Sequence, residues 1–329
     1  MLETSPDKPD PQAAASAEER AALASPAGDG QVSGRIALGR LGVCSRELRS
    51  ADLGRVREAA AELEQLGFEA LWVPGGARPG ALTAAEAALE ATEQVTVATS
   101  LLSIWIEEAA AVAAQAARLR EAHPGRFVLG LGLGRTFLDA DRSRQPMQAV
   151  RTSEAMRAYL DTLDRATPSL PAEARLLTAL SPETLELARR RAAGAHTFLT
   201  TPSYTRAARS ALGPDRLLAV QQLVAYEDDP PSARGHGRRF LSTYLGLSNF
   251  SEMLRRVEGF DDGDFADGGS DELVDALMAW GDESRIRELI ADHFAAGADH
   301  VCVQIAPSPD ETEMGVLRRL ALPLQFYVA

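Results

Sequence analysis

The chain has 329 residues, 45% of them hydrophobic, and carries a formal net charge of −13 with a sequence pI near 5.0. The hydrophobic fraction is sufficient for a buried core, and the length suits one large α/β barrel or two ordinary domains. An acidic surface repels nucleic-acid phosphates, and no basic stripe with interleaved aromatic residues is present. We therefore expect no nucleic-acid partner.

The start of the chain has neither a basic segment nor an apolar run, and no stretch of about eighteen apolar residues occurs. Neither a signal peptide nor a membrane span is predicted, and the cytoplasm is the expected compartment. The only two cysteines, Cys44 and Cys302, make a disulfide framework implausible. We predict two free thiols, because Cys44 lies toward the end of its predicted strand and Cys302 toward the start of its own.

Residues 1–34 are rich in Ala, Pro, Ser, Asp and Gly without periodicity, which predicts a disordered N-terminal extension. Over residues 35–329, apolar runs typical of strands alternate with helical stretches. The runs are IALGRLGVC (36–44), FEALWV (68–73), VTVATSLLS (95–103), FVLGLGLG (127–134), ARLLTAL (174–180), HTFLT (196–200), LLAVQQLVAYE (217–227) and HVCVQI (300–305). Eight such strands separated by helices predict one α/β domain, a (β/α)8 TIM barrel, with a doubly wound sheet as the alternative.

Two connections are long for this architecture, namely residues 135–150 after the fourth strand and residues 230–270 after the seventh. Both leave the C-terminal ends of strands, which is the face where barrels hold their active sites. We expect these insertions to be lids or substrate walls.

The histidines divide by their position relative to the strands. His123, His196 and His300 precede predicted strands, which places them on the opposite, stabilising face of the barrel, and His293 lies in the last helix before a strand. Only His236, in the second insertion, could reach the catalytic face. No paired-histidine motif, Cys-x-x-Cys or nucleophile elbow is present, so neither a metal site nor a hydrolase is predicted.

The run GLGLG at 130–134 has glycines at every second position, so Gly130, Gly132 and Gly134 share one face of a strand. If the leucines between them meet the outer helices, the glycines leave empty volume inside the barrel. A small-residue layer for packing and the close approach of a flat ring system both explain this pattern. Trp105, beyond the third strand, is likewise either a pocket wall or a hydrophobic cover.

Several stretches are typical of one family. They are FEALWVP (68–74), PGRFVLGLGLG (124–134), MRAYLDTLD (156–164), SPETLELARRRAAGAH (181–196), GGSDELVDALMAWGD (268–282) and AGADHVCVQI (296–305). Together they resemble the luciferase-like monooxygenase superfamily, and most of all its branch of coenzyme F420-dependent oxidoreductases. The resemblance implies a luciferase-like TIM barrel with the cofactor at the C-terminal face.

The resemblance also implies the binding residues. At Ser100–Leu101 the chain would form either a bulge or a non-prolyl cis peptide, and this segment would lie behind the cofactor ring. The ring would be lined by Gly132, Gly134 and Arg135, and the phosphate would meet the ends of strands five and six at Ala179, Leu180, Ser181, Thr200 and Thr201. Hydroxyl donation to an anion and ordinary capping explain the two threonines equally well, and Ser181 with Pro182 also forms a typical helix start.

Arg135 is the single candidate catalytic residue, an electrostatic stabiliser that also meets the anionic cofactor. The alternative is a surface arginine paired with Asp139 or Asp141. The chain departs from its relatives after strands two and four, and at the fifth helix it has Ser181-Pro182-Glu183 where they have Gly-Pro-Lys. A carboxylate there is unfavourable for a phosphate.

We expect an oxidoreductase that transfers a hydride between F420 and a small organic substrate. The alternatives are an FMN-dependent monooxygenase or reductase on the same barrel, and a barrel that has lost turnover and serves as a binding or scaffold protein. A homodimer is an assembly to be tested.

Overall fold

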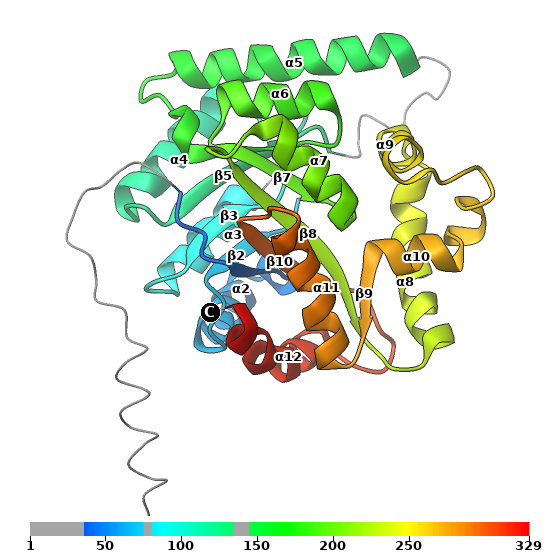
Figure 1. The fold of residues 1–329 in the computed structure, drawn as a ribbon. Helices are drawn as coiled ribbons and strands as arrows, with labels where there is room; N and C mark the ends of the chain where they lie inside the picture. Colours follow the sequence, from blue (N-terminus) through cyan, green and yellow to red (C-terminus); the bar gives the residue numbers. More distant parts are fainter. Residues whose placement is uncertain (1–35, 76–79, 135–144, 329) are drawn as a thin grey trace, which may run out of the picture. The chain divides into compact units, whose positions relative to one another are not determined.

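Parallel strands form the centre of the structure, a computed structural model that describes residues 36–75, 80–134 and 145–328 (Figure 1). The strands of the barrel are β1 (Leu41–Cys44), β2 (Ala70–Val73), β3 (Thr96–Thr99), β5 (Phe127–Gly132), β6 (Arg175–Thr178), β7 (Gly194–Phe198), β8 (Leu217–Tyr226) and β10 (His300–Ile305). They pair in that order, and β10 pairs with both β8 and β1, which closes the cylinder. The predicted α/β class and (β/α)8 TIM barrel are confirmed. The extension expected at residues 1–34 lies outside the described residues.

Helices surround the strands (Figure 1). The helices are α2 (Leu53–Gln65), α3 (Ala81–Glu90), α4 (Ala109–Ala122), α5 (Gln145–Arg165), α6 (Pro182–Arg191), α7 (Pro202–Leu212), α11 (Glu283–Ala295) and α12 (Glu313–Val328), and the turns are η1 (Arg46–Arg49) and η3 (Ala172–Ala174). Side chains of Asp52, Thr201 and Asp282 cap helix N-termini as their residue types favour. No helix in this part of the chain is long and apolar enough to cross a membrane.

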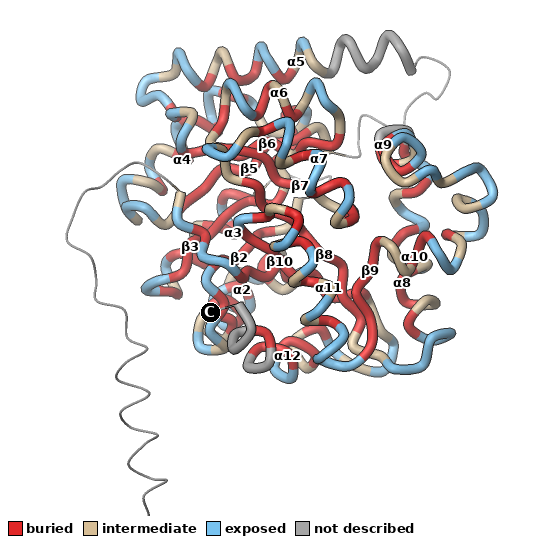
Figure 2. Tube along the Cα trace, viewed as in Figure 1, coloured by how far each residue is buried: buried red, intermediate tan, exposed pale blue. Residues whose placement is uncertain are grey.

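The strands separate two apolar cores. The inner core contains no helical residue and fills the barrel with Leu38, Cys44, Ala70, Trp72, Ala98, Val128, Leu176, Ala219 and Cys302. The outer core joins the alternate strand residues, such as Val43, Leu71 and Leu129, to the helices. Figure 2 shows the result: the strands are buried throughout, while each helix alternates between buried and exposed residues.

Both cysteines are buried in the inner core, and both are free. Gly42 lies opposite Cys302 across the β1–β10 pair, so Cys44 stands two residues nearer to the C-terminal strand ends. The predicted offset and the prediction of two free thiols are confirmed.

The insertion after the seventh strand contains α8 (Pro230–Leu245), α9 (Ser248–Glu258), η4 (Ala266–Gly268) and α10 (Asp271–Leu277), gathered beside β8 (Figure 1). It ends in a strand that was not predicted, β9 (Met278–Gly281), which pairs with the C-terminal half of β8. The N-terminal half of β8 pairs with β7. Of the insertion at 135–150, the structure describes only the part from Gln145, where α5 begins.

Candidate functional site at the barrel mouth

The third strand gains one residue at Ser100–Leu101, near the C-terminal ends of the strands. Ala98 lies opposite Val128 of β5, and pairing resumes in β4 (Leu102–Ser103), where Leu102 lies opposite Leu131. Four steps along β3 and β4 therefore match three steps along β5, which defines a β-bulge. The bulge predicted at this position is confirmed.

The cis peptide that was the alternative geometry for Ser100–Leu101 is wrong, since the only cis peptide among the described residues is Thr167–Pro168. The side chain of Thr99 accommodates the extra residue instead. Its hydroxyl donates to the carbonyl of Gly130 at 2.9 Å and accepts from the Gly130 N–H at 2.8 Å. The Thr99 hydroxyl thus takes the place of the backbone hydrogen bonds between the strands that the bulge interrupts.

The glycines of β5 face the inside of the barrel, and the bulge fills the space beside them. A Cβ on Gly130 would overlap the carbonyl oxygen of Thr99, and a Cβ on Gly132 would lie 2.6 Å from Cδ1 of Leu101. Gly134 has a φ of 68°, which favours glycine. The prediction of empty volume beside these glycines is therefore wrong, because the backbone of the bulge and the Leu101 side chain occupy that space. The partly exposed Leu101 side chain, rather than glycine backbone, is the surface offered at the mouth.

A chain of buried polar side chains crosses the barrel beneath the bulge. The Ser100 hydroxyl donates to Oε1 of Gln221 at 2.9 Å, and Nε2 of Gln221 donates to Oε1 of Gln304 at 2.7 Å. These residues come from the third strand, β8 and β10. These two hydrogen bonds tie the bulge to the far wall of the barrel.

His196 lies inside the barrel. The prediction that it lies on the stabilising face, at the N-terminal ends of the strands, is wrong. Because β7 begins at Gly194, two residues earlier than the apolar run indicated, His196 is the third residue of the strand. Its ring stacks on Trp72 at a centroid distance of 4.5 Å, and both ring nitrogens are buried. Burial lowers the pKa of His196 to about 3, with a further contribution from His300, so the ring is neutral.

Among the other histidines, His293 and His300 have hydrogen-bond partners, and His236 is buried in the insertion. Nε2 of His300 accepts from the Trp72 indole at 3.0 Å, and Nδ1 lies 3.0 Å from the carbonyl of Gly39, at the start of β10 as predicted. His293 bridges Thr205 and Gln222. His236 is buried in α8, and burial lowers its pKa.

The hydroxyls predicted to meet a phosphate already have protein partners. Ser181 and Thr184 form a capping box at the start of α6, and the Thr201 hydroxyl accepts from the Tyr204 N–H at 3.1 Å at the start of α7. The Thr200 hydroxyl donates to Thr197. Ala179 and Leu180 are buried in the link from β6 to α6. The capping explanation is therefore observed for Thr201, whereas phosphate binding stays a prediction.

Charged residues of α9 approach the same two helix starts. The Thr201 hydroxyl donates to the carboxylate of Glu258, the last residue of α9. The pKa of Glu183, in the first turn of α6, is lowered by hydrogen bonds to Ser181 and to backbone, and by the charge of Arg256. The helix starts thus carry two carboxylates and one guanidinium.

The comparisons with known proteins agree with this architecture. The family model described as luciferase-like monooxygenase matches residues 30–300. The chain belongs to the luciferase-like monooxygenase family. No curated protein matches the chain.

Solved structures with the same luciferase-like fold include proteins named for F420 and for FMN. An F420-dependent secondary alcohol dehydrogenase with an F420-acetone adduct is 17% identical, with 88% of this chain and 99% of that one covered and a TM-score of 0.63. The F420-dependent tetrahydromethanopterin reductase of Methanopyrus kandleri is 13% identical, with 89% and 100% covered and a TM-score of 0.62. The oxygenating constituent of 3,6-diketocamphane monooxygenase from Pseudomonas putida, in complex with FMN, is 16% identical, with 87% and 97% covered and a TM-score of 0.61.

Within this luciferase-like barrel, aromatic rings join the insertion to the end of β7. Phe198 meets the rings of Phe240, Tyr244 and Phe250 edge-on, with centroid distances of 5.1 to 6.1 Å. The helices α8 and α9 are therefore anchored to the C-terminal end of β7, and their role as a lid or substrate wall stays a prediction. Trp105, beyond β4, is the one large hydrophobic residue with substantial exposure among the described residues, at 38%.

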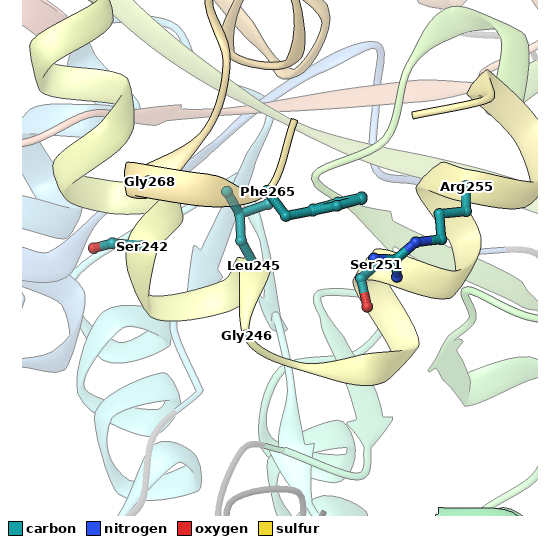
Figure 3. Close-up of a pocket in the computed structure, with 7 residues that line it drawn as sticks. All are labelled: Ser242, Leu245, Gly246, Ser251, Arg255, Phe265 and Gly268. Carbon is teal, nitrogen blue, oxygen red and sulfur yellow. The ribbon is translucent and has the colours of Figure 1, made fainter. Parts of the chain in front are cut away.

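A separate pocket of about 350 Å³ lies within the insertion (Figure 3). It is lined by Ser242, Leu245, Gly246, Ser251, Arg255, Phe265 and Gly268, none of which belongs to a barrel strand. Arg255 already pairs with Asp262 and lies 4.5 Å over the Phe265 ring. The pocket is therefore distinct from the barrel mouth.

Several residues near the barrel mouth were not predicted from the sequence, and one predicted residue lies outside the described part of the chain. Gln221 and Gln304 have the same strand parity as the inward Ala219 and Cys302, which was the available signal. The approach of Glu258 to Thr201 had no sequence signal. Arg135 lies outside the described residues, and its role stays a prediction.

Proposed function

We propose that the chain is an F420-dependent oxidoreductase that transfers a hydride between the deazaflavin and a small organic substrate. Membership of the luciferase-like family supports an oxidoreductase, and two similar structures carry F420 in their names. For this chain, the β-bulge at Ser100–Leu101 carries the proposal, because it places a partly exposed apolar side chain at the C-terminal end of a barrel strand. Neither nucleic acid nor a membrane is proposed as a partner, and a homodimer is the assembly to test.

The residues at the mouth fit the flat ring of such a cofactor. Leu101 covers the inward face of Gly132 and presents an apolar surface. The hydrogen bonds from Ser100 through Gln221 to Gln304 hold that surface in place. When bound, the cofactor would supply the hydride chemistry, and the protein's share would be to orient the ring and exclude water.

The anionic end of the cofactor fits less well. The starts of α6 and α7 attract anions, and Arg256 adds positive charge near them. Glu183 and Glu258 oppose an anion at the same helix starts. The ring site is therefore compatible with a cofactor as it stands, whereas the anion site requires a carboxylate to withdraw.

An FMN-dependent monooxygenase or reductase is the second candidate. The similarity to a structure in complex with FMN favours it, since FMN also joins a fused ring to a phosphate. A barrel that binds ligands without turnover is the third outcome.

Titration of the full-length protein with F420 and with FMN, each followed by cofactor fluorescence, tests these proposals. Saturable binding of F420 alone supports the first, and saturable binding of FMN alone supports the second. Absence of binding by both overturns them. Turnover is then measured from the cofactor's absorbance with a panel of small alcohols and ketones. Leu101→Asp, which brings a charge against the ring, is expected to abolish binding while the protein remains folded by circular dichroism.

A further inference from the structure

The start of α7 already holds an anion supplied by the protein itself. Thr201 is the N-cap of α7, and its hydroxyl donates to the carboxylate of Glu258. Glu258 ends α9, and Gly259 follows it with a φ of 79°, so the carboxylate stands where the helix stops and the chain turns. A carboxylate at a helix N-terminus is stabilised by the positive end of the helix dipole.

Apart from the exposed Ser203, the first turn of α7 has little else to offer a second anion. Pro202 has no N–H, and the N–H of Tyr204 is bound to the Thr201 hydroxyl at 3.1 Å. The remaining hydroxyl proton of Thr201, which is itself buried, points to Glu258. An external phosphate that takes this donor must displace the Glu258 carboxylate, because two anions at one donor repel each other.

We propose that Glu258 is an internal competitor for the cofactor's phosphate, so that α9 must release Thr201 before the anionic end of the cofactor can bind. This inference rests on the proposed function, since it concerns regulation of the same site. Arg256, two residues earlier in α9, acts on Glu183 at the start of α6, so one turn of α9 influences both helix starts.

The competition predicts which ligands respond to Glu258. A ligand with a phosphate has to displace the carboxylate, whereas a ligand with the same ring and no phosphate does not. Removal of the charge should therefore strengthen the binding of FMN or F420 and leave riboflavin, or the phosphate-free deazaflavin, unchanged. A coupling of about fivefold or more is expected, which is the lower range for linked binding events.

The test uses Glu258→Gln in the full-length protein, because a glutamine oxygen can still accept from Thr201 while the charge is lost. Glu252→Gln is the matched control, since Glu252 is an exposed glutamate of the same helix and the change in net charge is identical. Fluorescence titrations with each phosphate-bearing cofactor and its phosphate-free counterpart are made for the wild type and both variants. Thermal unfolding establishes that all three are folded.

A gain of affinity confined to the phosphate-bearing ligand and to Glu258→Gln supports the proposal. Equal affinities in the wild type and Glu258→Gln overturn it, as does an equal gain for the phosphate-free ligand or for Glu252→Gln. In those cases the cofactor still binds, so the proposed function stands. If no flavin or deazaflavin binds to any of the three proteins, the proposed function fails, and the inference fails with it.

Discussion

Gly130 shapes the barrel mouth because it has no Cβ. Its position on β5 faces the backbone of the bulge, and the carbonyl oxygen of Thr99 occupies the place that a Cβ would need. The neighbouring atoms are backbone, which cannot rotate away as the end of a long side chain can. The requirement for glycine at this residue is therefore steric and does not depend on a ligand.

Gly130→Ala is expected to destabilise the protein by roughly 1–3 kcal/mol or more, because the added methyl group overlaps a backbone carbonyl in a packed core. The measurement is urea unfolding at neutral pH. Gly235→Ala is the control: Gly235 lies within α8 with open space around its Cβ position, so alanine should be neutral or stabilise by up to about 1 kcal/mol. Equal stabilities of the two variants would contradict the steric explanation.

Residue-scale prediction from sequence succeeded where the pattern is local. The parity of the glycines follows from a few neighbouring residues on one strand, whereas the position of the bulge was implied by the family resemblance. The partner of Ser100 is Gln221, 121 residues away, and that of Thr201 is Glu258, 57 residues away. No sequence pattern specifies which distant side chains meet, so these contacts became visible only with the strand register and the insertion in place.

The element that defines the site is a strand in two parts, β3 and β4, with the bulge between them. Thr99 ends the first part, and its hydroxyl satisfies both the N–H and the carbonyl of Gly130, which the bulge would otherwise leave unpaired. Buried backbone groups without partners are costly. The threonine thus determines whether the strand can be interrupted at this point.

Thr99→Val is expected to destabilise the protein by about 2–4 kcal/mol, because the change keeps the shape and leaves two buried backbone groups without partners. Thr99→Ser keeps the hydroxyl and should cost only about 1 kcal/mol for the lost methyl group. Chemical denaturation of both variants decides the matter. If serine proves as destabilising as valine, the methyl group and not the hydroxyl maintains the bulge.

At the scale of elements, the eight barrel strands could be predicted because they are apolar runs separated by helical stretches. β9 could not, since its four residues follow α10 directly and Met278 is at once the cap of that helix and the first residue of the strand. The long β8 explains the extra strand. Strand β8 has 10 residues, and β7 pairs only with its N-terminal half. The C-terminal half would otherwise be an open sheet edge, and β9 pairs with it there.

For the whole molecule, the most general property of the interior is that it holds histidines in their neutral form. Burial lowers the pKa of His196 to about 3 and the pKa values of His293 and His300 to about 4. In the unfolded chain the same residues have pKa values of about 6.5. Above that pH both states are neutral, and the histidines add no pH dependence to stability.

Below about pH 6.5 these histidines become protonated in the unfolded chain but stay neutral in the folded barrel. The free energy of unfolding therefore falls as the pH falls toward 4. Between pH 7 and pH 5 each of the three buried histidines should contribute a loss of about 2 kcal/mol. His196→Gln should remove one such share. Urea unfolding at the two pH values measures the difference. An acid loss in His196→Gln as large as in the wild type would mean that His196 can be protonated inside the barrel, and the neutral stacking on Trp72 would then be the wrong description of this layer.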